Sequence, residues 1–187
     1  MSELLLSLCC LFLTGLPAAM IFRNLKCFRT LPPSPSESPS PISILIPVRS
    51  EANGIQRTLE CLRNLRGVEF EIIVLDDHSE DETVALVEAI AREEPNLRLH
   101  HSRPLPSGWN GKQHACWQLS QHARFDRLLF MDADVHLQPD AVARLSSEMD
   151  QRQSNPDDAT ENESPLMLLS AFLISKPSDG WRKDSFR

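Results

Sequence analysis

Four short apolar runs, separated by segments with helical periodicity, constrain the fold of this chain more than any other feature. The clearest runs lie at residues 42–47, 70–75 and 127–131, and a weaker one lies at residues 96–101. Runs of this length that are apolar throughout, rather than at alternate positions, are typical of strands buried on both faces. We therefore predict buried strands at residues 42–47 and 70–75, a further strand at residues 127–131 and a weaker one at residues 96–101.

Helical segments lie between these runs. Asn53 is expected to cap a helix that ends before Gly67, and Ser79 with Glu82 has the spacing of a capping box, which predicts a helix to about Arg92. Strand and helix thus alternate with short connections, which predicts an α/β fold with a mostly parallel, Rossmann-like sheet and helices on both faces. Two further helices and one further strand are expected at residues 110–123, 139–149 and 166–174.

The N-terminal segment is apolar and uncharged over residues 4–22, long enough to cross ~30 Å of hydrocarbon as a helix. Arg23, Lys26 and Arg29 follow it, so the positive-inside rule places the rest of the chain in the cytoplasm. We predict a retained transmembrane anchor. A cleaved signal peptide, whose positive charge would precede the apolar run, and an apolar helix packed on the domain remain alternatives.

These features divide the chain into an anchor (1–25), a Pro/Ser-rich spacer (26–41), an α/β domain (42–175) and a C-terminal segment (176–187). The net charge of −7 argues against a nucleic-acid partner, which would require a basic face. The five cysteines are scattered without zinc spacing, which is typical of reduced thiols in a cytosolic protein.

Acidic residues follow two of the predicted strands, at the edge where parallel sheets bind ligands. Asp132 and Asp134 are one residue apart, so their carboxylates would repel unless a cation lies between them or one is protonated. Mg²⁺ or Mn²⁺ would suit such a pair together with substrate phosphates. An Asp-x-Asp at a strand-end turn, with one Asp capping a helix, is the alternative.

Asp76 and Asp77 follow the second strand in the same way. Because Ser79 is expected to cap the next helix, both carboxylates would be free to accept hydrogen bonds from a base or a ribose.

In sequence, the segments ISILIPVRSEANGIQRTLECL, EIIVLDDHSEDET and RLLFMDADVHLQPDAV resemble the GT-A domain of family 2 glycosyltransferases. The loop PLPSGWNGKQHACWQ resembles the membrane-bound subgroup that acts on carotenoid- or hopanoid-type lipids. The resemblance covers about residues 41–145 and implies that residues 42–175 form a partial nucleotide-sugar-binding domain, followed by a divergent tail at residues 176–187. It implies a GT-A-like fold and inverting transfer of a sugar from a nucleotide-diphosphate donor, expected to be a UDP-sugar, to a lipid acceptor with Mg²⁺ or Mn²⁺.

The resemblance also implies roles for individual residues. Asp132 and Asp134 match the motif that holds the metal on the diphosphate, and Asp132 also touches the donor ribose. The expected nucleotide-sugar-binding residues are Pro47, Val48, Glu51, Asp76, Asp77, Lys112 and Asp132. The plainer interpretations are a solvated lysine for Lys112 and packing beneath a loop for Trp109 and Trp117.

After Phe172 the resemblance ends. Complete family members continue with an acceptor-binding half that supplies a base carboxylate, and the segment Gly180-Trp181-Arg182 is no substitute. The catalytic base is therefore expected to be missing. The chain is either a fragment of a longer enzyme or a member that binds the donor without transferring it. A GT-A-like nucleotidyltransferase is disfavoured, because no basic, Gly-rich loop follows the first strand.

Overall fold

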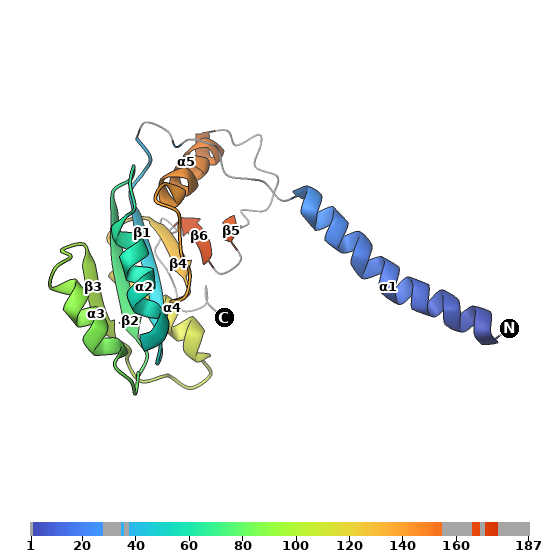
Figure 1. Ribbon diagram of the computed structural model, residues 1–187, viewed down its shortest axis with the longest axis horizontal. Helices are drawn as coiled ribbons and strands as arrows, with labels where there is room; N and C mark the ends of the chain where they lie inside the picture. The colour runs from blue at the N-terminus through green and yellow to red at the C-terminus, as the bar shows by residue number, and fades with distance from the viewer. Residues whose placement is uncertain (1, 28–34, 36–37, 155–165, 169–170, 176–187) are drawn as a thin grey trace. The chain divides into compact units, whose positions relative to one another are not determined.

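The computed structural model describes residues 2–27, 35, 38–154, 166–168 and 171–175 (Figure 1). The chain divides into two compact units, Met1–Pro32 and Pro33–Arg187, and the division falls within the Pro/Ser-rich segment. Most of the predicted spacer at residues 26–41, and all of the predicted tail at residues 176–187, lie outside the described residues.

Helix α1 (Ser2–Cys27) belongs to the first unit and contains Pro17. Its large apolar side chains are exposed where the structure describes them, as for Leu13 with 71% and Phe12 with 69% of the side-chain surface accessible. Within the described part of the chain, no helix has the combined length and apolar character needed to cross a membrane. The predicted transmembrane anchor is therefore unconfirmed.

The second unit is built on a sheet with the strand order β3-β2-β1-β4-β6-β5, as far as the described residues go. Strands β1 to β4 are parallel, whereas β6 is antiparallel to β4 and β5 is antiparallel to β6. The predicted α/β fold with a mostly parallel sheet is thus confirmed. The strands are β1 (Ile42–Val48), β2 (Phe70–Asp76), β3 (Leu97–His101), β4 (Arg127–Met131), β5 (Leu166–Leu168) and β6 (Ala171–Ser175). The helices are α2 (Ala52–Arg63), α3 (Thr83–Ala91), α4 (Gly111–His122) and α5 (Ala141–Ser154).

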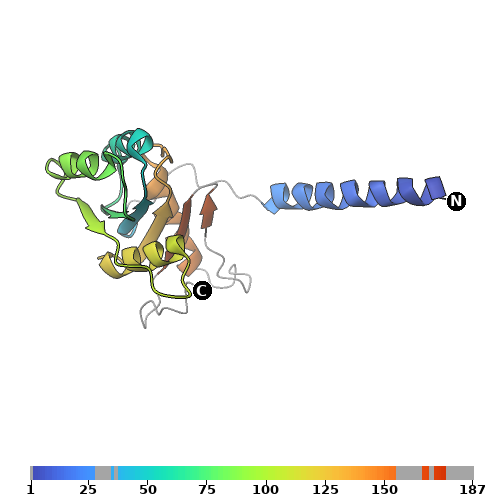
Figure 2. The ribbon, with the colours of Figure 1, turned by 90° about the horizontal axis from the view of Figure 1, so that it is seen from below.

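Helices cover both faces of the sheet. On one face, Leu45, Ile73 and Phe130 pack with Ala115 and Leu119 of α4 in a buried apolar cluster. Alternate residues of a strand point to opposite faces, and α2 and α3 lie on the side opposite α4 (Figures 1 and 2). Apolar residues on both faces explain why the strand sequences are apolar throughout rather than alternating.

Two predicted helix starts are wrong, and one aspartate explains both. Helix α2 begins at Ala52 with Glu51 rather than Asn53 at the N-cap, and α3 begins at Thr83 rather than after Ser79. The carboxylate of Asp81 accepts hydrogen bonds from the backbone N–H of Ala52 (3.1 Å) and of Thr83 (3.0 Å). It therefore satisfies a free N–H at the start of each helix, a role that the predicted capping boxes do not fill.

Two further boundaries differ from the prediction. The strand expected at residues 166–174 is a pair of antiparallel strands, β5 and β6, and residues 169–170 between them lie outside the described residues. Helix α5 starts at Ala141, just after Pro139, and extends beyond the expected end near Met149 to Ser154. The N-cap predicted at Asn110 is confirmed, because its side chain accepts a hydrogen bond from the backbone N–H of Lys112 at 3.0 Å.

Arg127, at the amino-terminal end of β4, links the sheet to α5, and its side chain is only 7% exposed. Its guanidinium donates to the backbone oxygen of Ser146 at 2.7 Å and to a carboxylate oxygen of Asp150 at 2.6 Å. Asp150 in turn accepts from the backbone N–H (3.2 Å) and the hydroxyl (2.8 Å) of Ser40, just before β1. The network ties the start of β1 to α5 and lies at the edge opposite the strand ends where ligands bind.

Candidate functional site

A cavity of about 480 Å³ lies at the carboxyl ends of the parallel strands. It is formed where β1 and β4 end, beside the segment that follows β2 and the first turn of α4. Its lining residues are Pro47, Val48, Arg49, Glu51, Asp77, Gly111, Lys112, Ala115, Asp132, Ala133 and Asp134. The fold therefore brings together every residue predicted for the site except Asp76.

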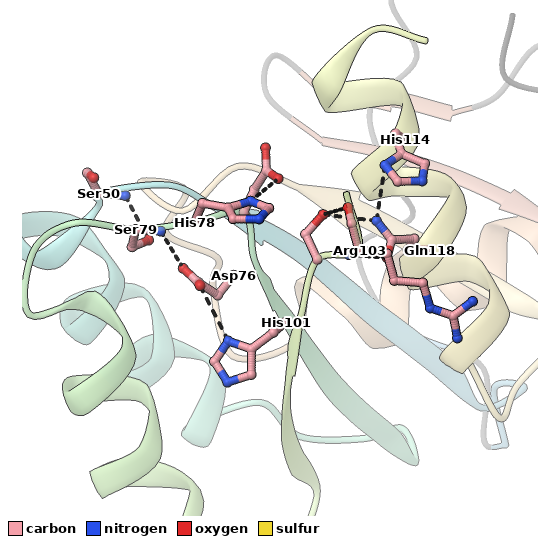
Figure 3. A network of polar contacts seen from close by, with 10 residues as sticks. Ser50, Asp76, His78, Ser79, His101, Arg103, His114 and Gln118 are labelled. Atoms are coloured by element: carbon pink, nitrogen blue, oxygen red, sulfur yellow. Dashed lines mark hydrogen bonds and ion pairs between the residues drawn. The ribbon is translucent and has the colours of Figure 1, made fainter. Parts of the chain in front are cut away.

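Asp76 is placed differently from the prediction, which left both aspartates free for a ligand. The side chain of Asp76 is 8% exposed and does not line the cavity. One carboxylate oxygen accepts from the backbone N–H of Ser79 at 3.0 Å, and the other lies 3.4 Å from Nδ1 of His101 (Figure 3). Burial alone would raise the pKa of Asp76, but the bonds from Ser79 and His101 outweigh it and hold the pKa below its usual value. Asp76 thus shapes the turn, while Asp77 faces the cavity.

The loops after β1 and β2 are joined by reciprocal hydrogen bonds. The backbone N–H of Ser50 donates to the hydroxyl of Ser79 at 2.9 Å (Figure 3), and the backbone N–H of Glu80 donates to the hydroxyl of Ser50 at 3.3 Å. Glu51 donates its backbone N–H to the hydroxyl of Thr83 at 2.9 Å. Ser50 and His78 have φ angles of 55° and 62°, a left-handed conformation that is unfavourable for side chains other than glycine. These bonds hold both strained residues beside the cavity.

Helix α4 brings its first turn to the cavity. Nζ of Lys112 lies 2.8 Å from a carboxylate oxygen of Asp132, at the end of β4. This hydrogen bond raises the pKa of Lys112 above its usual value, against the opposing effect of burial. A Cβ atom added at Gly111 would lie 3.8 Å from a carboxylate oxygen of Asp77, so the helix start approaches the segment after β2 closely. Lysine and carboxylates from three elements therefore meet in one place.

Helix α2 contacts the backbone between Asp132 and Asp134 and fixes its position. The hydroxyl of Thr58, which is fully buried, donates to the carbonyl oxygen of Ala133 at 2.6 Å. One turn earlier, a Cβ atom added at Gly54 would lie 3.4 Å from that same oxygen, an ordinary van der Waals contact, so α2 packs directly against this backbone. Ala133 is itself 4% exposed, whereas Asp132 and Asp134 on either side reach the cavity. The Asp-Ala-Asp segment is thus fixed at its middle residue.

Asp132 and Asp134 fit a hard divalent cation only in part. Carboxylates are suitable ligands for Mg²⁺ or Mn²⁺, which are commonly held by one or two carboxylates with substrate phosphates and water as the others. Within the described ranges, no group of three or more His, Cys, Asp or Glu side chains could hold a metal ion. The donor set therefore suits a cation that arrives with a phosphorylated ligand.

The sequence reasoning missed Arg49, Gly111 and Thr58. Arg49 lines the cavity directly after Pro47 and Val48. Its position at the end of a predicted strand could have identified it as a site residue. Gly111 precedes the lysine that was singled out. Thr58 gave no signal, because a threonine in an amphipathic helix has many possible partners and its acceptor lies 75 residues away.

Two tryptophans near α4 pack rather than line the cavity, in agreement with the plainer interpretation. Trp109 is 9% exposed, and its ring lies 5.7 Å from that of Trp117 and 5.5 Å from that of His114. Cys116 on the same helix is a free thiol, as is Cys61. Burial raises the pKa of Cys116 to about 11, so its thiol is unreactive at neutral pH.

Comparison with protein families gives a match over the whole of this site. The profile of the family described as glycosyl transferase family 2 matches residues 43–160. This range runs from β1 through α5 and includes every residue that lines the cavity.

Two curated proteins with similar sequences come from staphylococci. The 4,4'-diaponeurosporenoate glycosyltransferase of Staphylococcus haemolyticus is 32% identical over 101 residues, which are 54% of this chain and 26% of that protein. The protein of the same name from Staphylococcus aureus (strain MRSA252) is 35% identical over 105 residues, 56% of this chain and 27% of that protein. The chain therefore spans about a quarter of the length of these relatives.

Solved structures with a similar fold include one protein from Pyrobaculum calidifontis and one from S. aureus. A mannosyltransferase from Pyrobaculum calidifontis, in complex with GDP-Man and Mn²⁺, has a TM-score of 0.56 and 24% identity, covering 71% of this chain and 39% of that chain. Residues 1–349 of TarS from S. aureus, in complex with UDP, have a TM-score of 0.51 and 25% identity, covering 60% and 32%. The similarity shows a GT-A-like α/β fold, as predicted.

Proposed function

This chain belongs to glycosyl transferase family 2, and from that membership we propose that it binds a nucleotide-diphosphate sugar and acts in glycosyl transfer. The observation that carries the proposal is the cavity in which Asp77, Lys112, Asp132 and Asp134 meet at the carboxyl ends of parallel strands. TarS, which shares the fold, was solved with UDP, and this supports a UDP-sugar as the donor.

The charge of the cavity supports a divalent cation as part of the site. Four of its lining residues are acidic and two are basic, so a diphosphate entering alone would meet net repulsion. We propose that Asp132 and Asp134 hold Mg²⁺ or Mn²⁺ once phosphate oxygens are available to complete its ligands. When bound, the metal would stabilise negative charge on the departing nucleoside diphosphate as a Lewis acid.

Different residues of the cavity would contact different parts of the nucleotide-sugar donor. Pro47 and Val48 line the cavity where β1 ends and would contact the base, with Glu51 beside them. Asp77 would accept hydrogen bonds from the uracil or the ribose. Lys112, on the first turn of α4, would contact the diphosphate. Asp76 would act indirectly, by holding the turn that carries Asp77.

A lipid acceptor is proposed on the basis of the Staphylococcus relatives, which are named for 4,4'-diaponeurosporenoate. In the reaction, an acceptor oxygen, from a hydroxyl or a carboxylate, would attack the anomeric carbon as the bond from that carbon to the diphosphate oxygen breaks. The electron pair of that bond would leave with the nucleotide, and a carboxylate base would take the proton of a hydroxyl acceptor, whereas a carboxylate acceptor has no proton to lose. Direct attack of this kind inverts the anomeric configuration.

Binding of UDP in the presence and absence of Mn²⁺, measured by titration calorimetry on the full chain, tests the donor site. We expect Mn²⁺-dependent binding of UDP that Asp134→Asn weakens at least about tenfold, because one of the two protein ligands is lost. Asp126→Asn is the matched control: Asp126 is exposed and lies at the other end of β4, so this variant should bind like the wild type.

Two outcomes would contradict the assignment: UDP binding that does not depend on Mn²⁺, or an Asp134→Asn variant that binds like Asp126→Asn. Incubation with a UDP-sugar and a carotenoid-type acid then separates transfer from binding. Binding without any glycosylated product would favour the second candidate, a module that binds the donor or a partner without catalysis.

We propose a membrane location with the domain on the cytoplasmic side. The support is the uncharged sequence of residues 4–22, the basic residues that follow it, and the exposed apolar side chains of α1. Carbonate extraction of membranes from expressing cells would test this. Release of the chain into the soluble fraction would contradict the proposal.

A further inference from the structure

The ion pair inside the cavity joins a residue proposed for phosphate to a residue proposed for metal. Nζ of Lys112 lies 2.8 Å from a carboxylate oxygen of Asp132. Asp134, by contrast, forms no ion pair or hydrogen bond with any residue in the described ranges. In the ligand-free protein, one of the two carboxylates is therefore already neutralised by a cation from the chain itself.

The position of this lysine is set by its backbone rather than by the ion pair. The side chain of Asn110 accepts from the N–H of Lys112 at 3.0 Å and fixes the first turn of α4. The side chain is flexible and 65% exposed, and the side chain of Asp132 is 43% exposed. The lysine can thus exchange partners within the cavity without movement of the helix.

We propose that Lys112 couples metal binding to nucleotide binding, by occupying Asp132 until a diphosphate draws the ammonium group away. The inference rests on the proposed donor site. A divalent cation alone must compete with Lys112 for Asp132, and the described residues offer it no third His, Cys, Asp or Glu ligand. An entering diphosphate gives Lys112 another anion and gives the cation further oxygen ligands. Because such coupling is reciprocal, each ligand strengthens binding of the other.

Binding of Mn²⁺ to the full chain, followed by the electron paramagnetic resonance signal of free Mn²⁺ with and without UDP, tests the coupling. Lys112→Met should bind Mn²⁺ alone about fivefold more tightly than the wild type, since the competing exposed ion pair is gone. The factor by which UDP raises the affinity for Mn²⁺ should then be about five times smaller in this variant than in the wild type. Lys112→Arg retains the cation and should behave like the wild type.

Arg49→Met is the matched control, because Arg49 lines the same cavity and forms no ion pair with any residue that the structure describes. It should change the affinity for Mn²⁺ alone less than about twofold, since an exposed charge without a contact is screened by salt. An equal effect of Arg49→Met and Lys112→Met would mean that net charge alone matters, and would overturn the coupling.

If Lys112→Met weakens UDP binding but leaves the affinity for Mn²⁺ alone unchanged, Lys112 is only a phosphate ligand and the inference is wrong, while the donor site stands. If the wild type binds no Mn²⁺ even with UDP, the proposed donor site and the inference fall together.

Discussion

The hydrogen bond from Thr58 to Ala133 offers a way to disturb the Asp-Ala-Asp segment without touching a residue of the cavity. Thr58→Val keeps the shape of the side chain but removes the donor, which leaves the buried carbonyl oxygen of Ala133 without its hydroxyl partner. Leaving a buried acceptor unsatisfied costs about 1–3 kcal/mol of unfolding free energy. The same loss lets the backbone between Asp132 and Asp134 relax, and we expect Mn²⁺-dependent UDP binding to weaken about tenfold.

Thr58→Ser separates the two effects. It keeps the hydroxyl and removes one buried methyl group, which costs about 0.8 kcal/mol of unfolding free energy. Urea unfolding, followed through the fluorescence of the three tryptophans, should place both variants below the wild type. Calorimetric titration with UDP and Mn²⁺ should show weakened binding for Thr58→Val alone. Wild-type binding by Thr58→Val, or equal losses in both variants, would refute the view that this bond positions the aspartates.

Two further predictions concern the stability of the second unit. Arg127→Met should lower the unfolding free energy by about 1.5–3 kcal/mol, because it removes the hydrogen bonds from a buried guanidinium to Asp150 and to the backbone of Ser146. Arg92→Met, which breaks an exposed pair on α3, should cost less than about 0.5 kcal/mol in the same urea experiment, and similar losses in the two variants would contradict the first expectation. The pKa of Asp76 is lowered in the folded protein, so its carboxylate contributes stability above the unfolded value near 3.8, and this contribution is lost as the pH falls through the lower folded pKa. The unfolding free energy should therefore fall more steeply between about pH 5 and pH 3 in the wild type than in Asp76→Asn, and parallel slopes would show that Asp76 is not responsible.

Strands β1, β2 and β4 were predictable because nearly every residue in them is apolar, a pattern that a sheet covered on both faces accounts for, whereas the polar strand β3 gave a weaker signal. The parallel arrangement of the strands predicted that the site would lie at their carboxyl ends. It also predicted that Asp77, Asp132 and Asp134 would lie close together there. These inferences use the local sequence and one rule of topology. They hold because the competing local preferences at β1, β2 and β4 are weak.

The failures involve side chains whose partners are distant in the sequence. Asp81 caps α2 from a loop 29 residues further along the chain, so no local pattern around Ala52 could reveal it. Asp76 and Asp77 look equivalent in sequence, yet Asp76 turns inward, where it bonds to Ser79 nearby and also contacts His101, 25 residues further along the chain. The ion pair of Lys112 with Asp132 likewise required the three-dimensional arrangement of α4 and β4.

The reciprocal bonds between the loops after β1 and β2 have a consequence for protein engineering. Ser50 and Ser79 each satisfy a backbone group of the other loop, and Asp81 and Thr83 add two more links in the same direction. A chimaera that took only one of these loops from a relative would leave donors without acceptors and release both left-handed residues from their restraints. These two loops therefore form one module beside the cavity, and in an engineered enzyme they would have to be transplanted as a pair.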